Sequence, residues 1–280
     1  MKSLTYIDDT DEWPSSSCRP QDIFTSITNI VNICVQHCIA LDRWLTVHNM
    51  LIQKEAGNQK IHRLRVIHIQ EADWQAFLKL SVTRNTIHHA HKHQALRPNQ
   101  YGGVPGSQAI TPAVLNINIQ DYLRMTITPA AVTYKDAASC YDRLVEPYTN
   151  LALRAIGCSP SHLHLHSKVH QCMRYHIKTA NGIAPDFCRH NPPNEPFWGA
   201  GQGACDAAAR CTAVSSCIFY AYQNLCSPLT LRNPTNTSSQ NHSLLAFVDH
   251  ATTTIPLPST TNFDAITNTI THHVSSWEQL

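Results

Sequence analysis

A short strand–turn–strand pattern over residues 244–255 most limits what this chain can fold into. Its apolar and β-branched residues surround one acidic residue, Asp249, and the residue that follows it is His250. A second stretch of this kind, residues 130–134, leads to Asp136. Carboxylates at the ends of separate strands can meet in space and hold divalent cations. The sequence therefore predicts a sheet in which Asp136 and Asp249 lie close together.

Apolar residues recur with helical spacing over much of the remaining chain. We expect helices over residues 22–53 with a break near Asp42, 72–94, 109–125, 141–156, 162–173, 204–222 and 263–277. Pro147 should kink the helix over 141–156, and Gly157 should end it.

Strand patterns fall between these helices without a regular strand–helix–strand repeat. We expect a strand that ends at Asp136, the strand–turn–strand pattern around Asp249, and a strand pair over 175–179 and 196–199. Residues 61–69 fit a strand or a helix, and residues 97–106 and 228–241 carry the turn-forming composition of loops. This alternation predicts an α+β fold.

Composition narrows the protein class more than the function. The chain has 280 residues, 42% hydrophobic and 14% charged, which is typical of a globular protein with a sizeable core. A basic stretch between residues 54 and 97 contains few acids, which fits either a polyanion-binding face or an ordinary solvated face. The basic residues in it are Lys54, Lys60, Arg63, Arg65, Lys79, Arg84, Lys92 and Arg97.

The remaining sequence signals concern location. No run of 18 apolar residues is present, so we expect no membrane span. The first residues lack a charged segment leading into an apolar core, so we expect no secretory signal. The 11 cysteines form no CxxC pair, which favours reduced thiols in the nucleus or cytoplasm.

Three groups of histidines and cysteines raise the question of a metal site. They are Cys34, His37 and Cys38; His88, His89, His91 and His93; and His162, His164, His166, His170, Cys172 and His176. None has the paired short-range spacing of zinc fingers or of HExxH proteases. Histidines on the surface or satisfied in the core explain them more simply.

Four short segments stand in an informative order along the chain. They are residues 100–109 (QYGGVPGSQA), 136–144 (DAASCYDRL), 199–205 (GAGQGAC) and 247–250 (FVDH). In that order they resemble the Q-[YF]-G-x-x-P-G-x-x-A loop, motif A, the G-x-x-Q-G of motif B and the [FY]-x-D-D of motif C in the reverse transcriptase domain of retroelements. The resemblance is greatest to the non-long-terminal-repeat type and covers about residues 70–256.

The resemblance implies a reverse-transcriptase-like palm and fingers, in which an antiparallel sheet packs on helices. It implies that Asp136 and Asp249 hold Mg²⁺ against a deoxynucleotide triphosphate and the primer 3′-hydroxyl, as in two-metal nucleotidyl transfer. It also implies that Tyr141 lies under the incoming sugar, and that Gln202 and Gly203 position the template. The implied partners are an RNA template, a DNA primer and deoxynucleotide triphosphates.

Several positions depart from the family pattern. His250 replaces the second aspartate of motif C, and imidazole is a poor substitute for a carboxylate as a magnesium ligand. Val104 stands where relatives often carry arginine. Little chain follows Ile255, so we expect the thumb to be missing, and no endonuclease or RNase H segment is visible. A truncated, degenerate retroelement copy with weak or lost activity, a pseudoenzyme, fits these departures.

The organisation expected from the resemblance has four parts. They are a loosely ordered lead (1–20), a helical region of unknown role (21–69), the fingers and palm (70–256), and a tail with a weak helix (257–280). The lead contains residues 6–9 (YIDD), which resemble an intact motif C out of order; a chance acidic pair explains this string equally well.

Three functions stay open at this point. The first is a reverse-transcriptase-like domain with weak or no polymerase activity. The second is a non-catalytic nucleic-acid-binding remnant that uses the basic stretch. The third is an unrelated histidine-rich metal-binding or scaffold protein.

Overall fold

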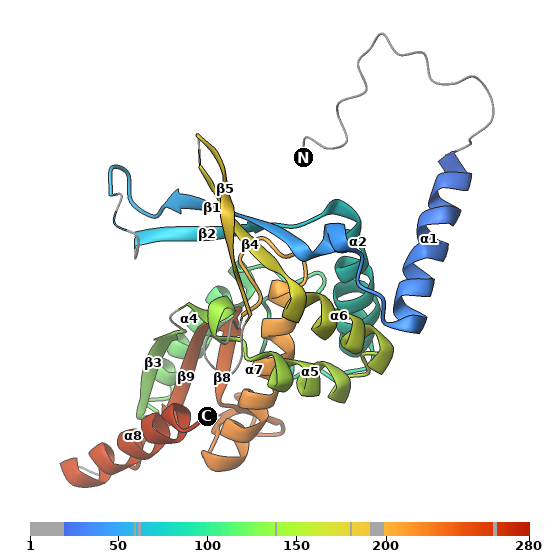
Figure 1. Ribbon diagram of the computed structural model, residues 1–280. Coiled ribbons are helices and arrows are strands. Elements are labelled where there is room, and N and C mark those ends of the chain that lie inside the picture. Colours follow the sequence, from blue (N-terminus) through green and yellow to red (C-terminus); the bar gives the residue numbers. More distant parts are fainter. Residues whose placement is uncertain are drawn as a thin grey trace.

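The computed structural model describes residues 20–58, 60, 63–137, 139–179, 181–190, 199–259 and 262–280 (Figure 1). The early YIDD string at residues 6–9 lies outside the described residues. The helices are α1 (Pro20–His37), α2 (Ala72–Leu78), α3 (His89–Lys92), α4 (Ile110–Met125), α5 (Glu146–Ala155), α6 (Pro160–Cys172), α7 (Ala207–Leu225) and α8 (Phe263–Glu278). Shorter helical segments cover Asp42–Leu45, Lys79–His88, which is a π-helix joining α2 to α3, and Cys140–Arg143.

The strands form two main sheets and a hairpin. They are β1 (Thr46–Gln53), β2 (Leu64–Ile69), β3 (Ala130–Asp136), β4 (Arg174–Thr179), β5 (Gly182–Arg189), β6 (Leu229–Arg232), β7 (Ser239–His242), β8 (Leu244–Phe247) and β9 (His250–Pro256). The larger sheet has the order β2-β1-β4-β5, and within it β1 and β4 run parallel. The second sheet, β3-β9-β8, is antiparallel throughout.

Helix α7 joins the parts of the molecule that carry the site. Its first turns pack against the turn that follows β3, and its last turns pack against β8, β9 and α8. Small side chains such as Ala209 and Ala213 let α3, α5 and the loop after α3 approach the same helix. A helix that is apolar or small on all sides is typical of a protein interior. Figure 1 shows α7 running from below the larger sheet down beside β8, with α5 on its other side.

Much of the element pattern predicted from the sequence is confirmed. The mixed order of helices and strands confirms the α+β class. The helices over 72–92, 110–125, 160–172, 207–225 and 263–278, the strand that ends at Asp136 and the strand–turn–strand around Asp249 are present. Gly157 follows α5 with a positive φ of 100°, as expected of a glycine that ends a helix.

The helical prediction is wrong for residues 46–53, which form β1. Residues 61–69, left open between strand and helix, contain β2 over 64–69, so the region 21–69 is helical only in part. Strand β1 pairs with both β2 and β4. Short apolar runs fit a helix or a strand equally well, and here the pairing with neighbouring strands decides.

Two smaller predictions are also corrected, and a third falls mostly outside the described residues. Pro147 does not kink a helix: it lies in the first turn of α5, where its missing N–H removes no helical hydrogen bond. Strand β4 pairs with β1 and β5, and most of the partner predicted for it, residues 196–198 of 196–199, lies outside the described residues. The loop predicted over 228–241 contains the β6–β7 hairpin.

The membrane prediction rests on helix length and hydropathy. Among the described residues, no helix combines the length and the apolar character that crossing a membrane requires.

Candidate active site

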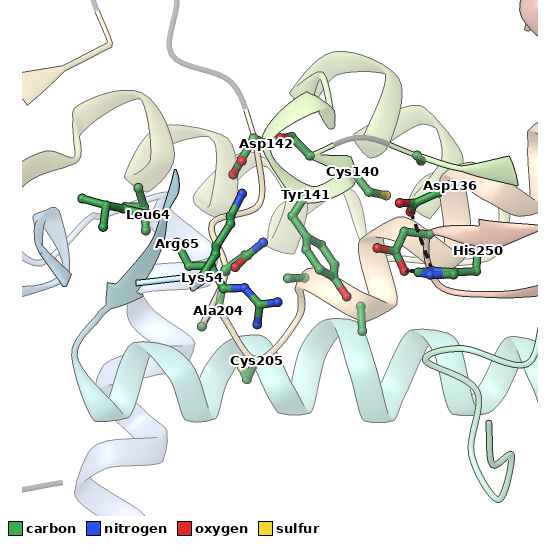
Figure 2. A pocket seen from close by; sticks show the side chains of 18 residues that line it. Lys54, Leu64, Arg65, Asp136, Cys140, Tyr141, Asp142, Ala204, Cys205 and His250 are labelled. Atoms are coloured by element: carbon green, nitrogen blue, oxygen red, sulfur yellow. Dashed lines mark hydrogen bonds and ion pairs between the residues drawn. The ribbon is translucent and has the colours of Figure 1, made fainter. Parts of the chain in front are cut away.

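A cavity of about 780 Å³, here called the main cavity, opens where the larger sheet faces the β3-β9-β8 sheet (Figure 2). Its walls come from segments far apart in the sequence. They are the end of the β1–β2 hairpin, the turn after β3, the loop before α7, and the turn between β8 and β9. The cavity is lined by all five residues predicted to take part in catalysis or in nucleotide and template binding, which are Asp136, Tyr141, Gln202, Gly203 and Asp249. His250, the degenerate position of motif C, also lines it.

Strand pairing brings the two predicted carboxylates together. Asp136 is the register partner of His250 between β3 and β9, and the backbone N–H of Ala137 donates to the carbonyl oxygen of Asp249 at 3.0 Å. His250 Nδ1 lies 2.9 Å from Asp249 Oδ1 and 3.8 Å from Asp136 Oδ1. We call these three residues the mouth cluster. The hydrogen bond between His250 and Asp249 raises the pKa of His250, and the charge of Asp136 adds to this effect.

The spacing of the mouth cluster fits a bound cation. One possible ligand atom from each of its three residues lies within 4.8 Å of the others, and the part of the chain that the structure describes contains no second group of this kind. Two ligands on one ion, with bonds of about 2.1 Å, lie roughly 3 to 4 Å apart.

The chemistry of the donors fits Mg²⁺ less well. Two carboxylates suit a hard cation, whereas the imidazole of His250 suits Mn²⁺, Zn²⁺ and similar ions better. The cluster therefore fits one divalent cation with a mixed oxygen and nitrogen ligand set better than a pair of magnesium ions.

The turn that carries Asp249 is held from behind by the 100–109 loop. Buried Gln100 accepts hydrogen bonds through Oε1 from the N–H groups of Gly102 at 2.9 Å and Val248 at 3.3 Å. A Cβ on Gly102 would lie 2.2 Å from the nitrogen of Val248, so only glycine allows this approach. Val248 has a φ of 57°, which is unusual for a β-branched residue and depends on such support. The supporting role of Gln100 was missed, because its partner Val248 lies 148 positions along the chain.

Tyr141 stands between two differently charged sides of the main cavity. Figure 2 shows its ring between Lys54 and Arg65 on one side and Asp136 and His250 on the other. Burial raises the pKa of Tyr141 to about 12, so the phenol stays neutral and can donate a hydrogen bond. Of the basic stretch noted in the sequence, Lys54 and Arg65 line this cavity.

Next to Tyr141, two thiols meet inside the wall. The sulfurs of Cys140 and Cys211 lie 3.1 Å apart, and both cysteines are free. The hydrogen bond from Cys211 lowers the pKa of Cys140.

The loop before α7 lies against strand β2. The N–H of His68 donates to the carbonyl oxygen of Gln202 at 2.6 Å, which forms an isolated bridge beside the larger sheet. Gly203 has a φ of 108°, and a Cβ there would lie 2.6 Å from the carbonyl oxygen of His68. Backbone conformation and close approach therefore both require glycine, which places Gln202 at the cavity wall.

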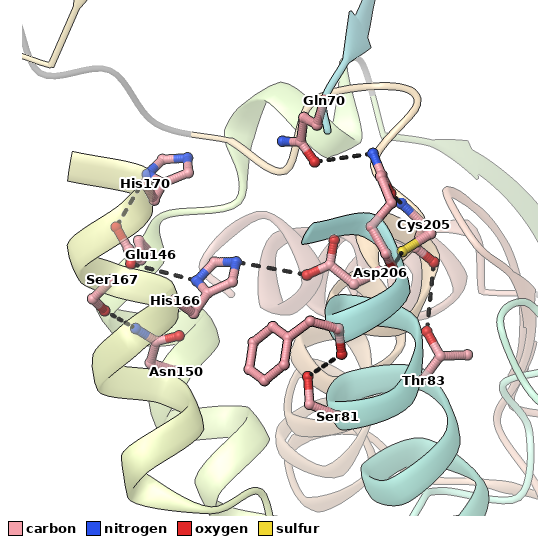
Figure 3. A network of polar contacts seen from close by, with 12 residues as sticks. Gln70, Ser81, Thr83, Glu146, Asn150, His166, Ser167, His170, Cys205 and Asp206 are labelled. Carbon is pink, nitrogen blue, oxygen red and sulfur yellow. Dashed lines mark hydrogen bonds and ion pairs between the residues drawn. The ribbon is translucent and has the colours of Figure 1, made fainter. Parts of the chain in front are cut away.

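A second set of histidines and acids lies behind this loop, in the protein interior (Figure 3). His166 is within ion-pair distance of Glu146 (3.7 Å) and Asp206 (3.6 Å), and His170 Nδ1 lies 3.2 Å from Glu146. The other ring nitrogen of His170 lies 3.0 Å from the carbonyl oxygen of Gly199. We call Glu146, His166, His170 and Asp206 the buried network. Two members of the third histidine group in the sequence thus have partners in the core.

The comparisons with known proteins agree with a reverse transcriptase fold. No protein-family model matches the chain, and no curated protein matches it by sequence. Solved structures of telomerase, the catalytic subunit of which belongs to the reverse transcriptase family, do match. Telomerase from Candida albicans in complex with a TWJ fragment of telomeric RNA gives 12% identity and a TM-score of 0.50, over 84% of this chain and 40% of that chain.

Two further telomerase structures give the same result. The complex from Candida tropicalis with the TWJ fragment is 15% identical over 89% of this chain and 41% of that chain, with a TM-score of 0.50. The apo telomerase from Candida tropicalis is 12% identical over 90% of this chain and 45% of that chain, also at 0.50. This chain therefore has a reverse-transcriptase-like fold and spans less than half the length of these structures. The non-long-terminal-repeat type and the division into palm and fingers stay predictions.

Proposed function

We propose that this chain is a reverse-transcriptase-like domain of retroelement origin that binds a nucleic-acid template–primer and a deoxynucleotide triphosphate at the main cavity. The proposal includes RNA-templated DNA synthesis that is weak or lost. One observation carries it: Asp136 and Asp249 come together at a cavity that also contains Tyr141 and Gln202, four residues expected from three separate motifs. The telomerase neighbours in complex with an RNA fragment support a nucleic acid as the partner.

Each wall of the cavity suits a different part of such a substrate. Lys54 and Arg65 supply positive charge for phosphate groups, and arginine can contact a phosphate with two donors. The neutral ring of Tyr141 offers a flat surface to a sugar. Gln202 and the exposed backbone of Gly203 offer hydrogen-bonding groups to a template base or phosphate.

His250 is the reason for proposing low activity. Asp136 and Asp249 would hold a divalent cation, which when bound would neutralise charge on the triphosphate. The third ligand position is occupied by the imidazole of His250 and not by a further carboxylate, and this imidazole pairs with Asp249. Losing one anionic ligand weakens both cation binding and the stabilisation of developing negative charge.

A second candidate function is nucleic-acid binding without synthesis. The contact between His250 and Asp249 favours this function, because the imidazole gives the Asp249 carboxylate a hydrogen-bonding partner within the protein itself. Under this function the main cavity would hold a single strand or a duplex end through Lys54 and Arg65.

Primer extension on an RNA template, with Mg²⁺ or Mn²⁺, tests the proposal. We expect little extension by the natural chain and a gain of about tenfold or more for His250→Asp, which corresponds to at least about 1.4 kcal/mol of barrier. Asp249→Asn in the His250→Asp background should abolish that gain. Asp121→Asn, on the exposed side of α4 and outside the lining of the main cavity, is the matched control and should leave it unchanged.

Binding at several salt concentrations, measured together with primer extension, separates the two candidates. A basic cavity that contacts phosphates should lose affinity steadily as salt rises. Binding without extension, even after His250→Asp, would favour the non-catalytic function. Strong extension by the natural chain would contradict the proposed loss of activity, and absence of both binding and extension would contradict both functions.

A further inference from the structure

The thiols of Cys140 and Cys211 meet beside the mouth cluster, although they are 71 positions apart in the sequence. Cys140 lies in the short helical turn that follows β3, and Cys211 lies in the second turn of α7. Their sulfurs are 3.1 Å apart, whereas a disulfide bond is about 2.05 Å long. A shift of about 1 Å is therefore enough to bring the sulfurs to bonding distance.

The two thiols differ in their access to small molecules. Cys140 is half-buried and lines the main cavity, so a small solute that enters the cavity reaches its sulfur. Cys211 is buried behind it, with its sulfur 3.7 Å from the carbonyl oxygen of Val248. This is the arrangement of a reactive cysteine with a resolving cysteine next to it.

We propose that Cys140 and Cys211 form an oxidation site that reacts with peroxides and closes to an intramolecular disulfide. Nothing in the metal or nucleotide chemistry of the proposed function uses these thiols, so the site is an addition to it.

The chemistry needs one peroxide and no other reactant. The sulfur of Cys140 attacks one peroxide oxygen, the O–O bond breaks, and Cys140 becomes a sulfenic acid while the departing hydroxide takes the thiol proton and leaves as water. The sulfur of Cys211 then attacks the sulfur of Cys140. The S–S bond forms, the S–O bond breaks, and the second hydroxide takes the proton of Cys211. Two thiols are oxidised by two electrons, and one hydrogen peroxide is reduced to two waters.

The bond would join two walls of the main cavity. The segment that contains Cys140 also carries Asp136 and Tyr141, and α7 begins directly after the loop that carries Gln202. A covalent link would fix these walls relative to each other and shift Cys140 toward α7. We expect oxidation to weaken template–primer binding by about fivefold or more, the lower end of typical coupling between sites; this consequence rests on the proposed function.

Disulfide mapping on the full chain tests the oxidation site itself. The protein is treated with hydrogen peroxide, the remaining thiols are blocked, and peptides from a non-reducing digest are analysed by mass spectrometry. We expect one linked pair that contains Cys140 and Cys211, lighter than the two peptides by two hydrogen atoms and separated by dithiothreitol. Oxidation that spares this pair while exposed Cys172 and Cys188 react would overturn the inference.

Variants define the two roles. Cys211→Ser should leave a sulfenic acid on Cys140 that a dimedone probe labels, and Cys140→Ser should leave Cys211 unreacted. The matched controls, Cys172→Ser and Cys188→Ser, should still form the linked pair. If Cys140 gives the same oxidation product in Cys211→Ser as in the natural chain, the inference fails. Because the mapping is made on the natural chain, a variant that does not fold cannot conceal that result.

The binding measurement distinguishes failure of this inference from failure of the proposed function. Template–primer affinity is compared for the reduced and the peroxide-treated protein. A linked pair in a protein that binds no nucleic acid in either state would leave the oxidation site in place and contradict the proposed function. Strong binding by the reduced protein, with no linked pair after peroxide treatment, would support the proposed function and contradict the oxidation site.

Discussion

Within the described part of the chain, histidine combines with acids in an exposed group, the mouth cluster, and in a core group, the buried network. In the mouth cluster, the side chains of Asp136, His250 and Asp249 are 71%, 70% and 36% exposed. In the buried network, those of Glu146, His166 and Asp206 are 4%, 8% and 1% exposed. Exposed charges interact weakly and can exchange partners, whereas buried charges depend on each partner they have. The same residue types are therefore available for binding in one place and fixed as structure in the other.

The buried network also supports the mouth of the cavity from behind. It links α5 through Glu146, α6 through His166 and His170, and the start of α7 through Asp206. His170 further contacts the carbonyl oxygen of Gly199, at the start of the loop that holds Gln202. Core histidines thus help to place a cavity wall without touching its contents.

The largest expected effect is on stability, from removal of Glu146. Glu146→Ala leaves His166 and His170 without their shared acidic partner, and each buried hydrogen-bonding group left without a partner costs about 1–3 kcal/mol. Urea unfolding followed by circular dichroism measures the loss. Asp136→Ala, which removes a carboxylate from the mouth cluster, is the control and should change the free energy of unfolding by less than about 0.5 kcal/mol. Equal losses in the two variants would remove the contrast between the two groups.

The second effect is a fall in stability at low pH. Burial and the nearby guanidinium of Arg210 lower the pKa of His166. In Glu146, burial alone would raise the pKa, but hydrogen bonds with His166 and His170 outweigh it, and the pKa lies well below its usual range. Both groups therefore bind protons more readily in the unfolded chain. Their contribution is complete above about pH 6.5 and is lost as the pH falls, first through His166 and then, below about pH 4.3, through Glu146.

Unfolding by urea over a pH series checks this window. One such group contributes a slope of up to about 1.4 kcal/mol per pH unit. His166→Gln should reduce the slope between about pH 6.5 and pH 4.3, to which His68, whose pKa burial lowers to about 4, also contributes. Because His166 helps to lower the pKa of Glu146, the variant should also reduce the slope below about pH 4.3. A natural chain that becomes more stable as the pH falls from 7 would show that the buried histidine is charged in the folded state.

The third effect concerns the support of the mouth cluster. Gly102→Ala places a methyl group against the backbone of Val248, and overpacking of this kind costs about 1–3 kcal/mol. Gly106→Ala is the matched control in the same loop, because its φ of 73° gives backbone strain with open space around the new methyl group. We expect Gly102→Ala to reduce Mn²⁺ binding at the mouth cluster, measured by electron paramagnetic resonance, and Gly106→Ala to leave it unchanged. Equal binding in the two variants would mean that the 248–249 turn does not depend on the loop behind it.

The sequence predicts the mouth cluster better than the buried network for a physical reason. Asp136 and Asp249 each follow a run of β-branched and apolar residues, so local pattern alone indicates a strand end. The contacts of Glu146 with His166 and of His166 with Asp206 join three helices, and no periodicity in the sequence signals which polar residues meet. The pairing of the thiols of Cys140 and Cys211 was missed for the same reason.

The errors in the fold also come from long-range contacts. Strand β1 was predicted as helix because its apolar run fits either element, and only its pairing with β2 and with the distant strand β4 distinguishes the two. The error at Pro147 came from placing the helix start too early: a proline in the interior breaks a helix, whereas in the first turn it fits. Long helices such as α7 and turns with strong local signals were predicted correctly, since nearby residues determine them.

A small effect on stability is expected from His250→Asp, which is the variant that most sharply tests the role of the mouth cluster. Exposed ion pairs contribute about 0–1 kcal/mol, so the free energy of unfolding should change by less than that. The ligand set changes much more, from mixed nitrogen and oxygen to oxygen alone, which favours Mg²⁺. Competition between Mg²⁺ and Mn²⁺, followed by electron paramagnetic resonance, should therefore show a higher relative affinity for Mg²⁺ in the variant. An unchanged preference would mean that His250 does not contact the ion, and that its pairing with Asp249 serves the turn in the way that His170 serves the loop behind it.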